Sequence, residues 1–94
     1  MTDQELLTYA AKAAGIEDKI FIPITQPLGY YWNPLKDDGE ALRLAVKLEM
    51  EINCMELSQF QVTTYDDKGN ATYIDDSCVR RAITRAAAEI GKGM

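Results

Sequence analysis

The fold is decided by the stretch YYWNPLKDDGEALRLAVKL, which covers residues 30–48 of the 94-residue chain. This stretch contains the only tryptophan of the sequence and its clearest helix start. Asn33 precedes a proline, which disfavours helical geometry, so the helix begins after this point. Asp37 can cap the first turn, and Glu40, three residues later, can reach back to complete a capping box.

The second half of this stretch has the apolar spacing of a buried helix. Its apolar residues follow the i, i+3, i+4, i+7 pattern of one helix face, namely Ala41, Leu44, Ala45 and Leu48. Leu42 and Val46 widen this face on its flanks and leave a narrow polar face. That polar face contains Glu40, Arg43 and Lys47. The pattern therefore predicts a central helix, the most buried of the molecule, packed on more than one side.

Helices are also predicted near both ends of the chain. The first starts with Thr2 and Glu5 in the spacing of a capping box. The last takes its cap from Asp76 or Ser77 and ends at Gly91. Alanine is frequent in both helices, which permits close approach to a neighbouring helix or sheet.

The remaining segments are predicted to be strands. Lys19–Ile24 is β-branched and aromatic, and Pro23 restricts it to the edge of a sheet or the end of a ladder. Glu51–Tyr65 alternates between apolar and polar residues but loses phase, which indicates a bulge or break near Glu56–Ser58. A turn that contains glycine then leads into the return strand of a hairpin, Ala71–Ile74.

The chain length and the element order predict one α+β domain. Ninety-four residues can build one modest core and are too few for two. The order α-β-α-β-β-α lacks strict βαβ alternation, so residues 1–94 are predicted to pack three helices on a small, mostly antiparallel sheet. No apolar run approaches the roughly 20 residues of a membrane span. The acidic start of the chain is also unlike a signal peptide, so we expect the protein to stay where it is made.

The residue content argues against catalysis and metal binding. The chain has no histidine, the commonest general base and metal ligand near neutral pH. Its two cysteines, Cys54 and Cys78, lack the CxxC spacing of a zinc or redox site. The acidic residues Asp37, Asp38 and Glu40 are explained by capping and by the helix dipole. We therefore expect no enzymatic activity, no bound metal and no cofactor.

Two motifs resemble small proteins encoded by tailed phages and prophages: WNPLKDDGEALRLAVKL at residues 32–48 and RRAITRAAAEIG at residues 80–91. The opening ELLTYAAKAAG, residues 5–15, also fits these proteins. The element order is more loosely similar to the phage α–β–α sandwich domains. The resemblance implies a phage or prophage origin and a fold, and it supplies no catalytic residue. Residues 19–28 and 49–71 depart from it.

The first candidate site is the aromatic loop before the central helix. Tyr30, Tyr31 and Trp32 could form an exposed aromatic platform, a residue type enriched in binding hot spots, with Asn33 beside them. In the alternative interpretation, Trp32 fills the edge of the core and Asn33 ties the loop to the backbone. The sequence leaves both interpretations open.

The second candidate site is the basic face of the last helix, formed by Arg80, Arg81 and Arg85. Beyond Ser77 the chain has four cations and one carboxylate, so the remainder of a chain with net charge −5 is net −8. The arginines could bind phosphate, form a solvated face, or meet the acidic body of a second copy in a homodimer. Nucleic acid is an unlikely partner because the acidic body repels it.

These observations favour binding over chemistry. The expected function is that of a non-enzymatic phage accessory protein, cytoplasmic in the bacterial host, which binds a host or phage protein and could serve host takeover or anti-defence. The first alternative is a module that binds a small ligand or nucleotide through the arginine face or the aromatic loop. The second alternative is nucleic-acid binding through the last helix.

Overall fold

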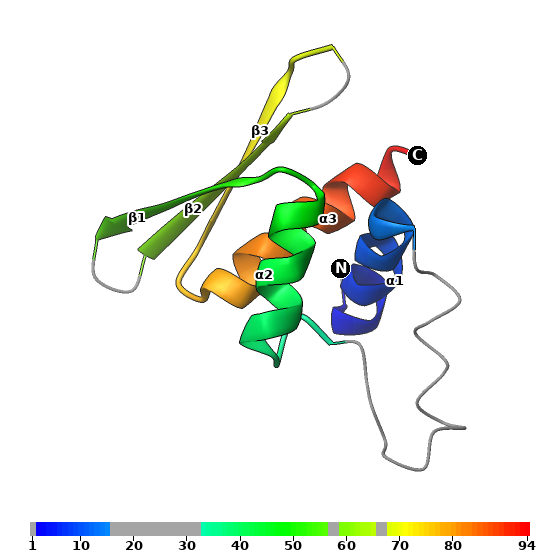
Figure 1. Ribbon diagram of the computed structural model, residues 1–94, viewed down its shortest axis with the longest axis horizontal. Coiled ribbons are helices and arrows are strands. Elements are labelled where there is room, and N and C mark those ends of the chain that lie inside the picture. The colour runs from blue at the N-terminus through cyan, green and yellow to red at the C-terminus, as the bar shows by residue number, and fades with distance from the viewer. Residues whose placement is uncertain (1, 16–32, 57–58, 66–67) are drawn as a thin grey trace.

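The computed structural model describes residues 2–15, 33–56, 59–65 and 68–94, which form three helices and one antiparallel sheet (Figure 1). In chain order the elements are α1 (Asp3–Ala14), α2 (Asp38–Lys47), β1 (Glu51–Glu56), β2 (Gln59–Tyr65), β3 (Ala71–Asp76) and α3 (Val79–Lys92). The three strands lie in the order β1-β2-β3. This arrangement confirms the predicted α+β fold. None of the helices in the described ranges combines the length and the apolar character of a membrane span.

Two of the predicted strands have different outcomes. The expected strand Lys19–Ile24 lies outside the described residues. The expected long strand Glu51–Tyr65 is divided into β1 and β2, which pair with each other in antiparallel register. The register shifts between Cys54 and Glu56, so the predicted irregularity is confirmed.

The hairpin of β2 and β3 places one apolar row against the helices. Val62 pairs with Ile52 of β1 and Ile74 of β3, so these three residues share one face of the sheet. Val62 is completely buried and Ile74 packs against the core, whereas Ile52, at the β1 end of the row, is exposed. Gly69 has a φ of 84°, the left-handed conformation expected for it in the turn of this hairpin.

The central helix is α3, and the prediction that gave this place to α2 is wrong. α3 contacts α1, α2, β2 and β3, and Figure 1 shows it between the sheet and α1. In α2, by contrast, Leu42 is 58% exposed and Val46 is 70% exposed. The physical reason is side-chain size, because the small residues of α3 let neighbours approach from several directions. Its buried residues are Ala82, Ile83, Thr84, Ala86, Ala87, Ala88 and Gly91.

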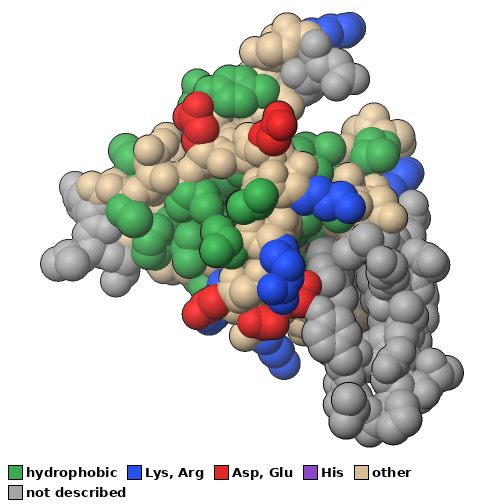
Figure 2. Space-filling view, viewed as in Figure 1, with side chains coloured by type: hydrophobic (Ala, Val, Ile, Leu, Met, Phe, Trp, Pro, Cys, Tyr) green, Lys and Arg blue, Asp and Glu red, His purple; other side chains and the backbone are tan. Residues whose placement is uncertain are grey.

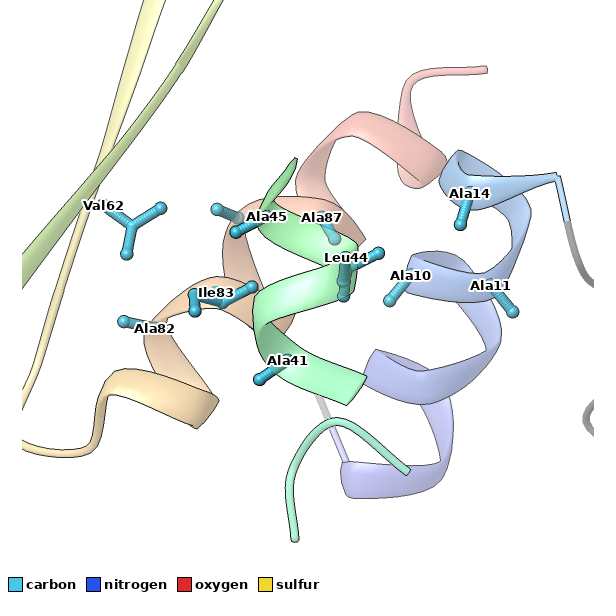
Figure 3. Close-up of a cluster of buried hydrophobic side chains, with 11 residues drawn as sticks. Ala10, Ala11, Ala14, Ala41, Leu44, Ala45, Val62, Ala82, Ile83 and Ala87 are labelled. Atoms are coloured by element: carbon cyan, nitrogen blue, oxygen red, sulfur yellow. The ribbon is translucent and has the colours of Figure 1, made fainter. Parts of the chain in front are cut away.

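The core is built mainly of alanines around a few larger side chains (Figure 3). Leu44 of α2 points toward Ala10 of α1 and Ala87 of α3. Ile83 of α3 and Val62 of β2 complete the contact between the helices and the sheet. α2 therefore reaches the core through one face only.

The predicted polar face of α2 is also corrected by the structure. Asp37 is the N-cap, and its side chain accepts a hydrogen bond from the backbone N–H of Gly39. Glu40, placed on the polar face by the sequence pattern, is 4% exposed. Its carboxylate accepts a hydrogen bond from Arg43, which offsets part of the cost of burying the charge.

The end of α3 depends on a glycine inside the helix rather than after it. The predicted end at Gly91 is wrong, because α3 continues to Lys92 and Gly93 is the C-cap. Gly91 is buried, and a Cβ atom built there would lie 1.8 Å from the backbone oxygen of Tyr9 in α1. The two backbones therefore approach more closely than any side chain would allow.

Replacing Gly91 by alanine should destabilise the protein. The Cβ atom would force α1 away from α3, at a cost of about 1–3 kcal/mol in the free energy of unfolding. Chemical denaturation measures this change. Gly93→Ala is the matched control, because a Cβ atom there is 3.7 Å from its nearest neighbours. It should leave stability unchanged or raise it by about 0.4–1 kcal/mol. Equal stabilities of the two variants would contradict the close contact.

The capping box of α1 makes a prediction about pH. The side chain of Thr2 accepts from Glu5 N, and the backbone N–H of Thr2 donates to the Glu5 carboxylate. The latter bond is the main reason why the pKa of Glu5 lies below its ordinary value. Ionised Glu5 therefore contributes stability that is fully present above the unfolded-state pKa and is lost as pH falls through the lower folded-state pKa.

An NMR titration of the Glu5 carboxyl group measures this effect directly. Thr2→Ala removes the hydroxyl group of the capping box and keeps the backbone N–H that donates to the Glu5 carboxylate. The pKa of Glu5 should therefore return part of the way to its ordinary value. An ordinary Glu5 pKa in the unmodified folded protein would show that the capping box is not formed.

Candidate functional site

Of the residues in the candidate aromatic loop, the structure describes only the last one, Asn33. Tyr30, Tyr31 and Trp32 lie outside the described residues. The side-chain oxygen of Asn33 accepts a hydrogen bond from the backbone N–H of Leu35 at 3.1 Å. Its backbone oxygen accepts hydrogen bonds from the backbone N–H groups of Lys36 and Asp37. Asn33 therefore shapes the turn that leads into α2, as one of the two sequence interpretations expects.

The three arginines lie together on the N-terminal half of α3, and each contacts an acidic residue of the same chain. Arg80 donates to Asp38 at 2.7 Å and to the backbone oxygen of Leu35 at 3.1 Å. The hydrogen bond with Asp38 raises the pKa of Arg80 above its ordinary value. Arg80 therefore ties α3 to the start of α2.

Asp76, at the end of β3, contacts the other two arginines. Its carboxylate accepts from Arg85 at 3.0 Å and lies 4.0 Å from the side chain of Arg81. Arg81 also donates to Asp3 of α1 at 3.0 Å. The second carboxylate oxygen of Asp76 accepts from the backbone N–H of Cys78 at 3.0 Å, at the start of α3. Asp76 thus serves as the local cap of α3, although the N-cap residue itself is Cys78 rather than Asp76 or Ser77.

These contacts change how the basic face is interpreted. The arginines are half-buried and connect α3 to α1, α2 and β3, so they have structural partners. A homodimer formed by this face on an acidic surface stays a prediction. It would have to exchange the internal ion pairs of Arg81 and Arg85 for intermolecular ones.

The acidic residues at the start of α2 are similarly engaged. Asp37 caps the helix, Asp38 pairs with Arg80, and Glu40 pairs with Arg43. Within the described part of the chain, no group of three potential ligands from among His, Cys, Asp and Glu is placed to hold a metal ion.

An exposed apolar surface over α2 and β1 is the site that the sequence interpretation missed. We call it the α2–β1 surface and define it by Leu42 and Val46 of α2 and Ile52 near the start of β1, all of which are exposed. Met55 is exposed as well, but it lies three residues beyond Ile52 on the strand, where side chains alternate between faces, and next to the register shift. Figure 2 shows hydrophobic side chains gathered over α2 and the adjoining strands. The backbone N–H of Met50 donates to Ala45 at 3.0 Å, which joins the start of β1 to the end of α2.

The sequence did contain a signal for this surface. Leu42 and Val46 are four residues apart and therefore share a helix face. Each lies about 100° around the helix from Ala41 and Ala45, which face the core. A helix with two apolar stripes can be buried on both or can present one of them to a partner. The sequence interpretation chose the first option, whereas the structure leaves the stripe of Leu42 and Val46 exposed.

The side chain of Asp76 is predicted to stabilise the fold through its contacts with Cys78 and with two arginines. Asp76→Ala removes the hydrogen bond to Cys78 and the partner of two arginines, so the free energy of unfolding should fall by about 1–3 kcal/mol. Asp75→Ala is the matched control, because Asp75 is exposed and contacts Arg85 through its backbone oxygen, which the substitution keeps. Its effect should stay within about 0.5 kcal/mol. Urea denaturation measures both changes. Equal losses of unfolding free energy in Asp76→Ala and Asp75→Ala would show that the Asp76 side chain is not the source of the stabilisation.

Comparison of the chain with protein-family models, with curated proteins and with solved structures found no match in any of the three. The comparisons therefore neither support nor oppose the resemblance to phage proteins. The α2–β1 surface is the part of the described geometry that bears most directly on function.

Proposed function

We propose that this chain is a non-enzymatic accessory protein of phage or prophage origin that binds a host or phage protein through the α2–β1 surface. The observation that carries the proposal is the exposure of Leu42 and Val46, one turn apart on α2. The phage origin is proposed from the motifs at residues 32–48 and 80–91.

The energetics of the surface support a binding role. Fully burying a leucine or valine side chain is worth about 1.5–3 kcal/mol. Most of this energy is unused at Leu42 and Val46, because more than half of each residue is exposed. Exposed apolar clusters of this kind mark interaction sites when polar residues surround them. Arg43 and Lys47 supply such a rim on α2.

The sheet suggests what kind of protein segment is bound. Among the described strands β1 is at one edge of the sheet, and residues 51–55 are all exposed. Ile52–Met55 is uncharged and glutamates lie only at the two ends of β1, so the middle of this edge lacks the charges that usually discourage pairing. We propose that the partner adds an extended segment along β1 and packs apolar side chains on Leu42 and Val46.

A protein partner fits the surface better than a nucleic acid. The α2–β1 surface is apolar, whereas nucleic-acid sites are dominated by cations that contact phosphates. The arginines that could have formed such a site contact Asp3, Asp38 and Asp76. The net charge of −5 also opposes association with nucleic acid.

The test is capture of a partner from a host lysate by the unmodified protein and by the double variant Leu42→Gln, Val46→Gln. Glutamine keeps the net charge and favours helix, so the variant should remain folded by circular dichroism. Loss of the apolar contacts should reduce recovery of the partner at least about tenfold, since each 1.4 kcal/mol is a factor of ten in affinity.

Tyr73→Gln is the control for this test. Tyr73 is 61% exposed and is in register with Thr63, next to Val62 in β2, so it lies on the other face of the sheet. The Tyr73→Gln variant should capture the same partner as the unmodified protein. If the folded double variant retains full capture, the α2–β1 surface is not the binding site. If the captured chain is a second copy of this protein, the surface is a homodimer interface and the proposed heterologous partner is wrong.

A further inference from the structure

A cavity of about 580 Å³ lies between the far end of the β2–β3 hairpin and the C-terminal end of α3. Figure 1 shows the hairpin rising away from α3 at this end, so the sheet and the helix diverge. The lining residues come from α1, β2, β3, α3 and the residues that follow α3: Ala13, Thr64, Tyr65, Thr72, Glu89, Ile90, Gly93 and Met94. The volume is within the range of small-molecule sites.

Thr64 is a buried polar residue in the lining of the cavity. Thr64 is 3% exposed, and its Oγ1 atom has no hydrogen-bond partner among the described residues. Leaving a buried hydroxyl group unpaired costs about 1–3 kcal/mol, so such groups in folded proteins usually have a partner. Thr72 pairs with Thr64 across the hairpin, which puts a second hydroxyl group on the same face of the sheet. The sheet side of the cavity therefore offers hydroxyl groups to a ligand.

The helix side of the cavity carries one carboxylate and a partial negative charge. Glu89 is exposed and contributes a carboxylate. The helix dipole places partial negative charge at this end of α3, where the backbone oxygens of Glu89, Ile90 and Gly91 accept hydrogen bonds from Gly93 and Met94. The three arginines lie on the other half of the same helix. Of the neighbouring lysines, Lys12 donates to the backbone oxygen of Met94 at 3.3 Å, and the charge of Lys92 acts on Glu5 of α1.

We propose that this cavity is a binding site for an ammonium or guanidinium group carried on a short alkyl chain. The cation would contact the Glu89 carboxylate and the hydroxyl oxygen of Thr64. The alkyl chain would pack on the apolar residues of the lining, Ala13, Ile90 and Met94. Such a group occurs in small amines and in the lysine or arginine side chains of peptides. The proposal is independent of the α2–β1 surface, because none of the residues that define that surface lines the cavity.

The proposal is tested by NMR titration of the folded protein with four probes. Agmatine and n-butylamine represent the small cations, the peptide Gly-Lys-Gly represents a side-chain source, and hexanoate is an anion of similar length. We expect saturable shifts at the amides of Thr64, Thr72 and Glu89 with at least one cationic probe and none with hexanoate. Binding of the small amines identifies a small-molecule site, whereas binding of the peptide alone identifies a side-chain site.

Two variants separate binding from folding. Glu89→Gln removes the carboxylate charge from an exposed position and should weaken binding about tenfold, whereas Glu49→Gln makes the same change outside the cavity and should not. Thr64→Val replaces an unpaired hydroxyl group by a methyl group, so it should keep or raise the unfolding free energy while it lowers the affinity.

Three outcomes would overturn the proposal. The first is the absence of saturation by every cationic probe. The second is equal binding of hexanoate, which would indicate an unspecific apolar hollow. The third is unchanged affinity in both Glu89→Gln and Thr64→Val. Unchanged amine binding by the double variant Leu42→Gln, Val46→Gln would show that the two sites are separate.

Discussion

The architecture depends on the backbone contact between α1 and α3. At Gly91 the space normally occupied by a Cβ atom is filled by the backbone of Tyr9. Such close contact is possible because the facing positions are glycine and alanine, including Ala10 and Ala87. A helix this closely covered on one side, with the sheet on the other, becomes the centre of the molecule. α2 then occupies the remaining side through Leu44, and its second apolar stripe stays outside the core.

The two ends of α3 are held by different forces. At its N-terminal half, arginines reach acidic residues on α1, α2 and β3, and Asp76 is shared between two of them. At its C-terminal half, close packing against α1 replaces ion pairing. This division puts the three arginines at one end of the helix, whereas the other end carries Glu89 and Lys92.

Much of the fold could be predicted from the sequence because local rules determine it. The capping box of Thr2 and Glu5, the cap at Asp37 and the left-handed Gly69 follow from residue chemistry over a few positions, and the structure confirms all three. The burial of Glu40 and the exposure of Leu42 could not be predicted in this way. Periodicity shows that a helix has apolar residues, but the number of its neighbours depends on the packing of distant elements.

The candidate sites were harder to predict for the same reason. The grouping of Arg80, Arg81 and Arg85 is visible in the sequence, since they are close together on one helix. Their partners are not visible, because Asp3 and Asp38 are separated from them by about 40 residues or more in the chain. The cavity beside Thr64 is also non-local, since it forms where the hairpin and α3 diverge.

The exposed edge of β1, whose four middle residues are uncharged, also has a consequence for the solubility of the protein. An unblocked edge strand can pair with the same strand of another molecule, which is a route to aggregation. Like-charge repulsion between copies opposes this association, and here it comes from a net charge of −5. The repulsion disappears as pH approaches the isoelectric point near 4.6. Solubility of the isolated protein should therefore be lowest in mild acid, where β1 edges can meet without an electrostatic barrier.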